Sequence, residues 1–142
     1  MAFGSVEVRP AGAAEVASVA ALGREAADRR DRVADLTAAQ IEGRLVVAER
    51  DGEIVGYATH GRFFEYDFVE MLIVRPSDRR TGVATALVSA IESRSQTGKL
   101  FTSTNRSNMA MQRLCARLGF EPSGVVDNLD EGDPEMFFVK RL

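Results

Sequence analysis

Residues 69–87 read VEMLIVRPSDRRTGVATAL, and this stretch decides the fold prediction. It begins with an apolar run that stops at Arg75-Pro76, since proline cannot donate to a strand ladder. A short polar turn with Arg79 and Arg80 follows, and Gly82 opens an amphipathic segment. A strand, a donor-rich turn and a helix start present unpaired backbone N–H groups to an anion. An ordinary strand-to-helix connection has the same outline, so the rest of the chain must decide between the two.

Length and composition narrow the class of protein. The chain has 142 residues, of which 45% are hydrophobic, as expected for one globular domain spanning residues 1–142. A net charge of −3 argues against nucleic-acid binding. The single cysteine, Cys115, excludes an intrachain disulfide, and the single histidine argues against a protein-only metal site. No stretch approaches the ~20 apolar residues of a membrane span, so we expect a soluble, cytoplasmic protein without a membrane anchor.

Helices and strands are expected to alternate along the chain without a strict repeat. The predicted strands are 6–8, 45–49, 54–59, 68–74, 100–104, 123–126 and 136–142, and the predicted helices are 13–30, 37–43, 82–94 and 107–118. Asp51-Gly52 is typical of a hairpin turn, Thr37 of a helix N-cap and Gly119 of a helix C-cap. The pattern predicts an α+β fold with a mixed, mostly antiparallel sheet flanked by helices.

Three short sequence motifs follow one another along the chain. The first is the hairpin ERDGEIVGYAT at 49–59, the second is V-x-P-x-x-R-R-x-G-V-A from Val74 to Ala84, and the third is N-x-x-x-x-x-L-x-x-x-x-G-F from Asn108 to Phe120. With these strings the chain resembles, over nearly its whole length, the GNAT superfamily of acyl-CoA-dependent N-acyltransferases. The second string matches the superfamily's acyl-CoA signature R/Q-x-x-G-x-G/A. The resemblance implies a GNAT-like fold.

The resemblance also implies acetyl-CoA as co-substrate. Coenzyme A carries a diphosphate, which the first-turn N–H groups and the helix dipole can bind without a metal. Gly82 lets the backbone approach the diphosphate closely, and Ala84 is nearly as small. The predicted cofactor-binding residues are Leu72, Ile73, Val74, Arg79, Arg80, Thr81, Gly82, Val83, Ala84, Thr85, Asn105 and Asn108. The alternatives are that Leu72 and Val74 are core residues and that Asn108 is a helix cap.

Glu70 is the first candidate for the general base. It interrupts an apolar strand, and the string Phe68-Val69-Glu70 is similar to the F-x-E string that holds the catalytic glutamate in the histone-acetyltransferase branch. We expect partial burial to raise its pKa toward the operating pH, as suits a base. The alternative is a surface glutamate on the outer face of the strand.

Cys115 is the candidate for the general acid. Many relatives carry a tyrosine at this position, which is placed to protonate the departing thiolate, and this chain departs from that pattern. A thiol can donate a proton. The alternative is packing, because Cys115 lies on the apolar stripe formed by Met111, Leu114 and Leu118. In that case another group, such as Tyr66 or water, supplies the proton, or no acid is required.

Two segments are candidates for the acceptor site. Phe64 and Tyr66 belong to an aromatic cluster before the central strand, and they either line the acceptor site or close the end of the sheet. Asp130 and Glu131 belong to an acidic turn, which favours a cationic amine as acceptor if it is not simply a solvated loop. The acceptor is predicted to be a small-molecule or peptide amine, and the chain a monomer or homodimer.

The sequence therefore predicts an N-acetyltransferase that moves an acetyl group from acetyl-CoA to a primary amine. Direct attack in a ternary complex is expected, because Cys115 as an acyl carrier would need a neighbouring base that the sequence does not offer. The alternative function is a non-catalytic acyl-CoA-binding or regulatory module of the same fold, with Cys115 in place of tyrosine as its mark.

Overall fold

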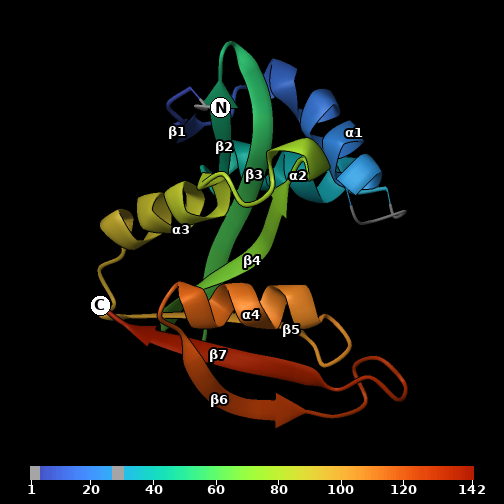
Figure 1. The fold of residues 1–142 in the computed structure, drawn as a ribbon, viewed down its shortest axis with the longest axis vertical. Coiled ribbons are helices and arrows are strands. Elements are labelled where there is room, and N and C mark those ends of the chain that lie inside the picture. The colour runs from blue at the N-terminus through green and yellow to red at the C-terminus, as the bar shows by residue number, and fades with distance from the viewer. Residues whose placement is uncertain (1–3, 27–30) are drawn as a thin grey trace. The chain divides into compact units, whose positions relative to one another are not determined.

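The computed structural model describes residues 4–26 and 31–142, which form two compact units. The first unit comprises Met1–His60 and Met71–Ser93, and the second comprises Gly61–Glu70 and Arg94–Leu142. Two long strands, β3 (Glu53–Phe63) and β4 (Tyr66–Val74), each contribute residues to both units (Figure 1). That residues 1–142 form a single domain stays a prediction.

In the described part of the first unit there are three α-helices and an antiparallel arrangement of strands. Its helices are α1 (Val16–Ala26), α2 (Val33–Ile41) and α3 (Val83–Arg94), and its strands include β1 (Glu7–Pro10) and β2 (Leu45–Arg50). β2 pairs with β1 on one side and with β3 on the other, both antiparallel. Asp51 and Gly52 both have positive φ, 52° and 78°, which confirms the predicted hairpin turn.

The core of the first unit is built from α1, α2 and the central strands. Val19, Leu36, Val47 and Tyr57 are completely buried in it. A Cβ at Gly23 of α1 would lie 2.6 Å from the Tyr57 hydroxyl oxygen, so the glycine lets α1 pack directly on β3.

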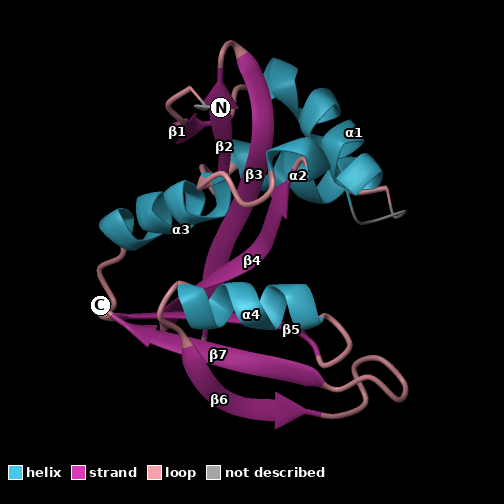
Figure 2. Ribbon diagram, viewed as in Figure 1, coloured by secondary structure: helices cyan, strands magenta, loops and turns pink. Residues whose placement is uncertain are grey.

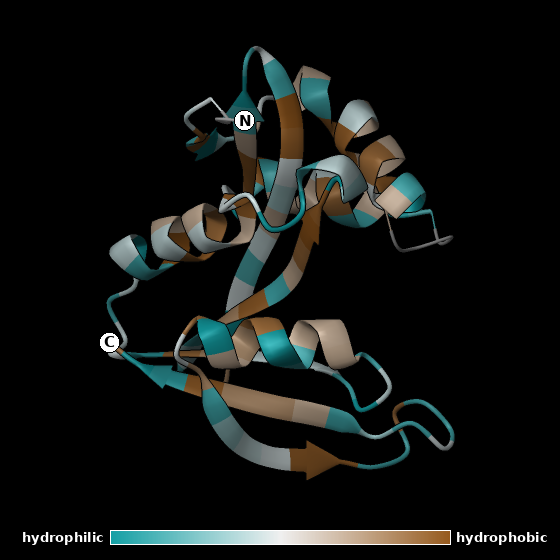
Figure 3. Cartoon of the chain, viewed as in Figure 1, coloured by the Kyte–Doolittle hydropathy of each residue, from teal (hydrophilic) through white to brown (hydrophobic). Residues whose placement is uncertain are grey.

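The second unit contains α4 (Met109–Arg117) and the strands β5 (Lys99–Asn105), β6 (Glu121–Val126) and β7 (Glu135–Arg141). β4 pairs with β5 in parallel, whereas β7 pairs antiparallel with both β5 and β6 and lies between them (Figure 2). The strand order β1-β2-β3-β4-β5-β7-β6 confirms the predicted mixed, mostly antiparallel sheet. The hydrophobic arrowhead of β6 in Figure 3 is exposed, since Val125 and Val126 are 47% and 40% accessible.

One predicted helix boundary lies outside the described residues, and another was wrong. Residues 27–30, at the end of the predicted helix 13–30, lie outside the described residues, and α1 is described to Ala26. The prediction that Thr37 caps a helix was wrong, because α2 begins four residues earlier. There the Asp31 carboxylate accepts from the Val33 N–H at 3.0 Å, and the Thr37 hydroxyl donates to the Val33 carbonyl at 2.7 Å from inside the helix. Within the described ranges, no helix has the length and apolar content needed to cross a membrane.

Candidate active site

The turn between β4 and α3 has the geometry that the sequence predicted. A short 3-10 turn, Pro76–Asp78, follows β4, and α3 begins at Val83. Its first backbone hydrogen bond joins the Ala86 N–H to the Gly82 carbonyl at 3.0 Å, so the N–H groups from Gly82 to Thr85 have no partner inside the helix. These N–H groups, which include those of Val83 and Ala84, are the donors with which a helix start can bind an anion. Binding of a diphosphate here stays a prediction.

Gly82 is required by the backbone and not by packing. Its φ is +89°, a left-handed value that L side chains adopt only with strain. A Cβ built there would meet nothing within 4 Å. The open space beside this glycine fits the close approach of a diphosphate to the helix start.

Gly56 of β3 sets how closely α3 approaches the strands. A Cβ at Gly56 would lie 2.9 Å from both the Ile73 carbonyl oxygen and Cγ1 of Val83. Val83 and Leu87, which are fully buried, therefore pack directly on the glycine backbone. The first turn of α3 is thus held against the strands that precede it.

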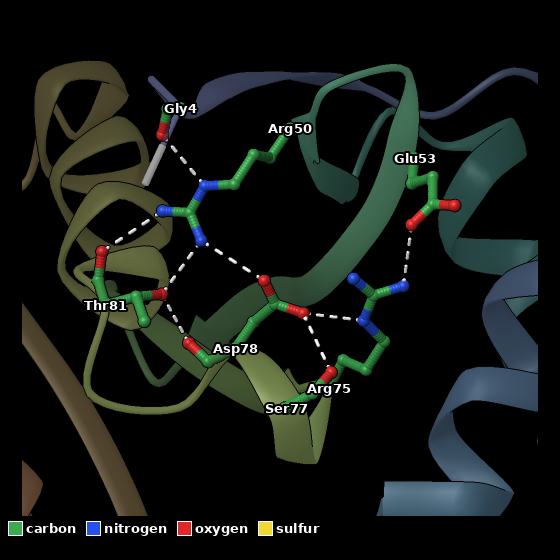
Figure 4. A network of polar contacts seen from close by, with 7 residues as sticks. All are labelled: Gly4, Arg50, Glu53, Arg75, Ser77, Asp78 and Thr81. Carbon is green, nitrogen blue, oxygen red and sulfur yellow. Dashed lines mark hydrogen bonds and ion pairs between the residues drawn. The ribbon is translucent and has the colours of Figure 1, made fainter. Parts of the chain in front are cut away.

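A buried polar network braces the same turn (Figure 4). Arg50 and Asp78 are each 6% exposed and form an ion pair at 3.2 Å. Arg75 donates to Oδ2 of Asp78 at 2.6 Å and to Glu53 at 2.9 Å. Burial acts to raise the pKa of Asp78, but the hydrogen bond and charge of Arg75 together with the hydrogen bonds from Ser77 and Arg50 outweigh it, and the pKa is lowered. This network was not predicted from the sequence. The pattern that could have indicated it is Asp78 followed three residues later by Thr81, in a turn between apolar segments.

The two predicted diphosphate arginines differ in their surroundings. Both are exposed. Arg79 donates to the Ala26 carbonyl at 3.0 Å, so part of its hydrogen-bonding capacity is used within the protein. Arg80 has a φ of +61°, a left-handed conformation that a non-glycine residue rarely adopts.

Leu72, Ile73 and Val74 lie in the last part of β4. The parallel ladder of β4 with β5 has three pairs and ends at Val69, although β4 itself continues to Val74. Ile73 packs against the core of the first unit, and the Leu72 and Val74 side chains are half-buried. The core alternative was stated for Leu72 and Val74, which are only half-buried, whereas Ile73 is the residue that packs on the core. A role of the backbone groups in binding the pantetheine arm stays a prediction.

Glu70 belongs to the second unit and is exposed. The expected partial burial was wrong, because neighbouring strand residues face opposite sides and it is Val69, 2% exposed, that points inward. A Cβ at Gly61 of β3 would lie 2.8 Å from Oε2 of Glu70, so the carboxylate rests directly against the glycine backbone. Sequence reasoning missed Gly61.

An aromatic cluster lies on the face of β4 that also carries Glu70. Phe63 contacts the rings of Phe64, Phe68, Phe101 and Phe137 at centroid distances of 5.0–5.5 Å. Phe68 is paired with Phe101, and Phe68 and Glu70 are two residues apart, hence on one face of the strand.

The two predicted aromatic substrate residues lie at the margin of this cluster. Tyr66 contacts Phe101 at 5.7 Å and has the Lys99 ammonium 5.1 Å from its ring centroid, while Phe64 is 86% exposed. Sequence reasoning missed Phe101 and Phe137, since they come from strands far along the chain.

Cys115 is 1% exposed, on the inner side of α4. Burial raises the pKa of its thiol to about 11. A buried, protonated thiol on the inner side of a helix is what the packing alternative for Cys115 predicted.

The two predicted asparagines make hydrogen bonds within the second unit. Asn108 accepts from the Met111 N–H at 3.1 Å, which is the helix-cap alternative. Asn105 donates to Asp130 at 2.8 Å and to the Asp133 carbonyl at 3.2 Å, so it ties the acidic turn to the end of β5. Glu131 is exposed. The structure thus brings Asn105 and Asp130, predicted as cofactor and substrate residues, into direct contact.

Glu135, at the start of β7, was not predicted. The Ser103 hydroxyl donates to its Oε2 at 3.2 Å, and within the described residues its Oε1 is buried without a hydrogen-bond partner. Burial raises the pKa of Glu135, and the charges of Asp130 and Asp133 act in the same direction. The sequence feature that could have predicted a buried carboxylate here is a glutamate immediately before the apolar run MFFV.

Comparisons with known proteins agree with this geometry. Residues 15–120 match the model of the acetyltransferase (GNAT) family. A GNAT-family acetyltransferase from Bacillus cereus is 37% identical, with a TM-score of 0.90 over 97% of this chain and 98% of that chain. No curated protein sequence matched the chain.

Two more distant structures share the fold and carry ligands. The Salmonella typhimurium protein yncA, solved with its cofactor acetyl-CoA, is 22% identical, with a TM-score of 0.72 over 96% of this chain and 93% of that chain. Diaminobutyrate acetyltransferase EctA from Paenibacillus lautus, solved with L-2,4-diaminobutyric acid and coenzyme A, is also 22% identical, with a TM-score of 0.78 over 97% and 96%.

The fold and the family match define an acetyltransferase scaffold. The chain belongs to the GNAT acetyltransferase family, whose members use acetyl-CoA as co-substrate. The open side of Gly82 and the first-turn N–H groups of α3 fit the diphosphate of that co-substrate.

Proposed function

We propose that the protein is an N-acetyltransferase that acetylates a primary amine by direct attack in a ternary complex. Acetyl-CoA supplies the activated acetyl thioester. The N–H groups from Gly82 to Thr85 bind its diphosphate, with Arg79 and Arg80 adding positive charge. The observation that carries the proposal is this helix start, combined with an exposed carboxylate, Glu70, on the strand that leads to it.

Glu70 is proposed as the general base. An amine is protonated at neutral pH and must lose a proton before it can attack a thioester. An exposed carboxylate accepts that proton directly or through one water molecule. Contact with the Gly61 backbone limits the positions that the carboxylate can take, which supports a defined role.

For the proton that the departing thiolate takes up, the proposal does not name a single donor. The Cys115 thiol was the candidate acid, and its burial and its pKa of about 11 support packing instead. Water or the Tyr66 hydroxyl is then the donor in this proposal. No acyl-enzyme is formed, because a buried protonated thiol is a poor nucleophile.

The acceptor is proposed to be a small-molecule or peptide amine with positive charge. Asp130 and Glu131 in the acidic turn and the aromatic side chains of Phe64 and Tyr66 are the groups proposed to contact it. Replacing both acidic residues with their amides is expected to raise the KM for the amine. An unchanged KM would remove the acidic turn from the acceptor site. Cytoplasmic location and the monomeric or homodimeric state stay predictions.

The test is release of coenzyme A from acetyl-CoA over a panel of primary amines, with Glu70→Gln beside wild type. We expect the substitution to lower kcat about 100-fold or more, as for a general base, while acetyl-CoA binds as before. Glu65→Gln, an exposed neighbour in the same hairpin, is the matched control. Equal kcat in Glu70→Gln and wild type would refute the role of Glu70.

The alternative, a non-catalytic acyl-CoA-binding module, is favoured by one observation. Cys115 stands where many relatives have tyrosine, and it is buried. Tight acetyl-CoA binding by wild type without turnover of any amine in the panel would support this alternative.

A further inference from the structure

We infer that Arg50 is a positioning residue for the diphosphate-binding turn. It lies at the end of β2, 31 residues before Thr81 in the chain, and its guanidinium contacts Gly4, Asp78 and Thr81 (Figure 4). The inference rests on the acetyl-CoA site at the start of α3 and adds the residue that fixes the shape of this site.

The Arg50 guanidinium is buried and uses all three of its nitrogens. Nε donates to the Gly4 carbonyl at 2.9 Å. Nη1 donates to Oδ1 of Asp78 at 3.2 Å and to the Thr81 hydroxyl at 2.9 Å, and Nη2 donates to the Thr81 carbonyl at 3.1 Å. The planar fork therefore holds both the side chain and the backbone of Thr81, which a lysine ammonium cannot do in the same geometry.

The bond to the Thr81 carbonyl decides where the next N–H group points. In a planar trans peptide the C=O and the following N–H point in opposite directions, and no cis peptide bond occurs among the described residues. Because the Thr81 carbonyl points to Arg50, the Gly82 N–H points away from Arg50. Arg50 thus orients the first donor of the anion site without contacting the anion itself.

Arg80, the residue before Thr81, needs such support. Its φ is +61°, a left-handed value that a residue with a Cβ adopts only with strain. A strained conformation persists only where the surroundings fix it, and here the surroundings are the Arg50 fork, the Asp78 carboxylate and the bond from the Thr81 hydroxyl to the Asp78 carbonyl at 2.5 Å.

The decisive experiment compares two acetyl donors in Arg50→Met and Arg50→Lys. Acetyl-CoA contains the diphosphate, whereas S-acetylpantetheine has the thioester arm without any phosphate. We expect both variants to raise the Kd and KM for acetyl-CoA about 10-fold or more, with kcat at saturation close to wild type, and to leave turnover of S-acetylpantetheine unchanged. Binding is measured by calorimetry and does not depend on the amine, so a failure of the proposed reaction and a failure of this inference are distinguishable.

A second pair of variants keeps the test valid if loss of Arg50 prevents folding, since an unpaired buried Asp78 is costly. Thr81→Val removes the hydroxyl and Thr81→Ser retains it, so only the valine variant is expected to weaken acetyl-CoA binding. Arg44→Met removes an arginine next to the opposite end of β2 and is the matched control. Unchanged acetyl-CoA affinity in Arg50→Met, or in Thr81→Val where Arg50→Met does not fold, would overturn the inference, as would equal losses with both donors.

Discussion

The carboxylate of Glu70 lies where a side chain at Gly61 would have to be, since a Cβ at Gly61 would stand 2.8 Å from Oε2 and 3.0 Å from Cδ of Glu70. The two residues belong to the same unit and to neighbouring strands, β3 and β4. Because Gly61 has no side chain, the carboxylate of the proposed base can pack against the strand backbone.

Replacing Gly61 with alanine therefore tests the position of the base. The clash is with the end of a flexible side chain, so we expect a small change in stability, within about 0.5 kcal/mol as for ordinary surface substitutions. The displaced carboxylate is expected to lower kcat about 10-fold, because small misplacements of catalytic groups cost rate. Steady-state kinetics and thermal unfolding on the same preparation check both expectations. Wild-type kcat in Gly61→Ala would show that the contact has no role in catalysis.

Replacing Gly82 with alanine tests the helix start, and Gly52 provides a matched control. Both glycines have positive φ, +89° and +78°, and neither has an atom within 4 Å of a built Cβ. Both alanine variants are expected to lose about 1–2 kcal/mol of stability from left-handed backbone strain. Only Gly82→Ala is expected to weaken acetyl-CoA binding, about 10-fold or more by calorimetry. Equal affinity in the two variants would move the diphosphate site elsewhere.

The thiol of Cys115 is expected to behave as a packed side chain. Iodoacetamide at pH 8 should label the native protein at least about 10-fold more slowly than the protein in urea, because burial and a pKa of about 11 keep the thiol protonated and shielded. The unfolded thiol has a pKa near 8.5. The native state therefore holds this proton more tightly, and its contribution to stability is lost as pH rises from about 9 through 11.

The variant Cys115→Ala tests both the catalytic role of the thiol and its effect on stability at alkaline pH. The variant should retain kcat and should lack the alkaline loss of stability that the thiol causes. A large fall in kcat without a fall in stability would restore Cys115 as the general acid.

Glu135→Gln is expected to stabilise the protein at neutral pH. The raised pKa of Glu135 means that the native state favours the protonated form, so its contribution to stability is present at low pH and is lost as pH rises through the folded pKa. The amide removes the charge and can still accept from Ser103. We expect a gain of up to about 1 kcal/mol at pH 7, limited by solvent screening, and none at pH 4.

Urea unfolding at the two pH values measures this difference. Asp127→Asn, which removes an exposed carboxylate from the neighbouring turn, is the control for the loss of one negative charge. A loss of stability at pH 7 in Glu135→Gln would show that the Glu135 charge is satisfied in the native state.

Much of the fold was predictable because the local rules were sufficient. Apolar runs bounded by turn residues located the strands, and Asp51-Gly52 with positive φ at both positions formed the predicted hairpin. The start of α2 was missed because its N-cap position holds Arg32, which makes no side-chain cap hydrogen bond. Asp31, one residue earlier, accepts from the Val33 N–H instead.

The candidate site was predictable only in part. The helix start at Gly82 follows from a contiguous string, and so it was found from the sequence. Glu135, Phe101 and Phe137 come from strands that are distant from β4 in the chain, and only their pairing register brings them to one face. The partial burial expected of Glu70 failed because strand alternation placed Val69 inward.

The sequence by itself determined the order of helices and strands, the family resemblance and the turn that leads into α3, because each depends on residues close together in the chain. The tertiary structure decided which side chains support that turn and that carboxylate. Arg50 reaches Thr81 from another strand, and Gly61 faces Glu70 across a strand pair. Such contacts depend on how distant segments pack, and side-chain packing is fixed by the whole core and not by any local string.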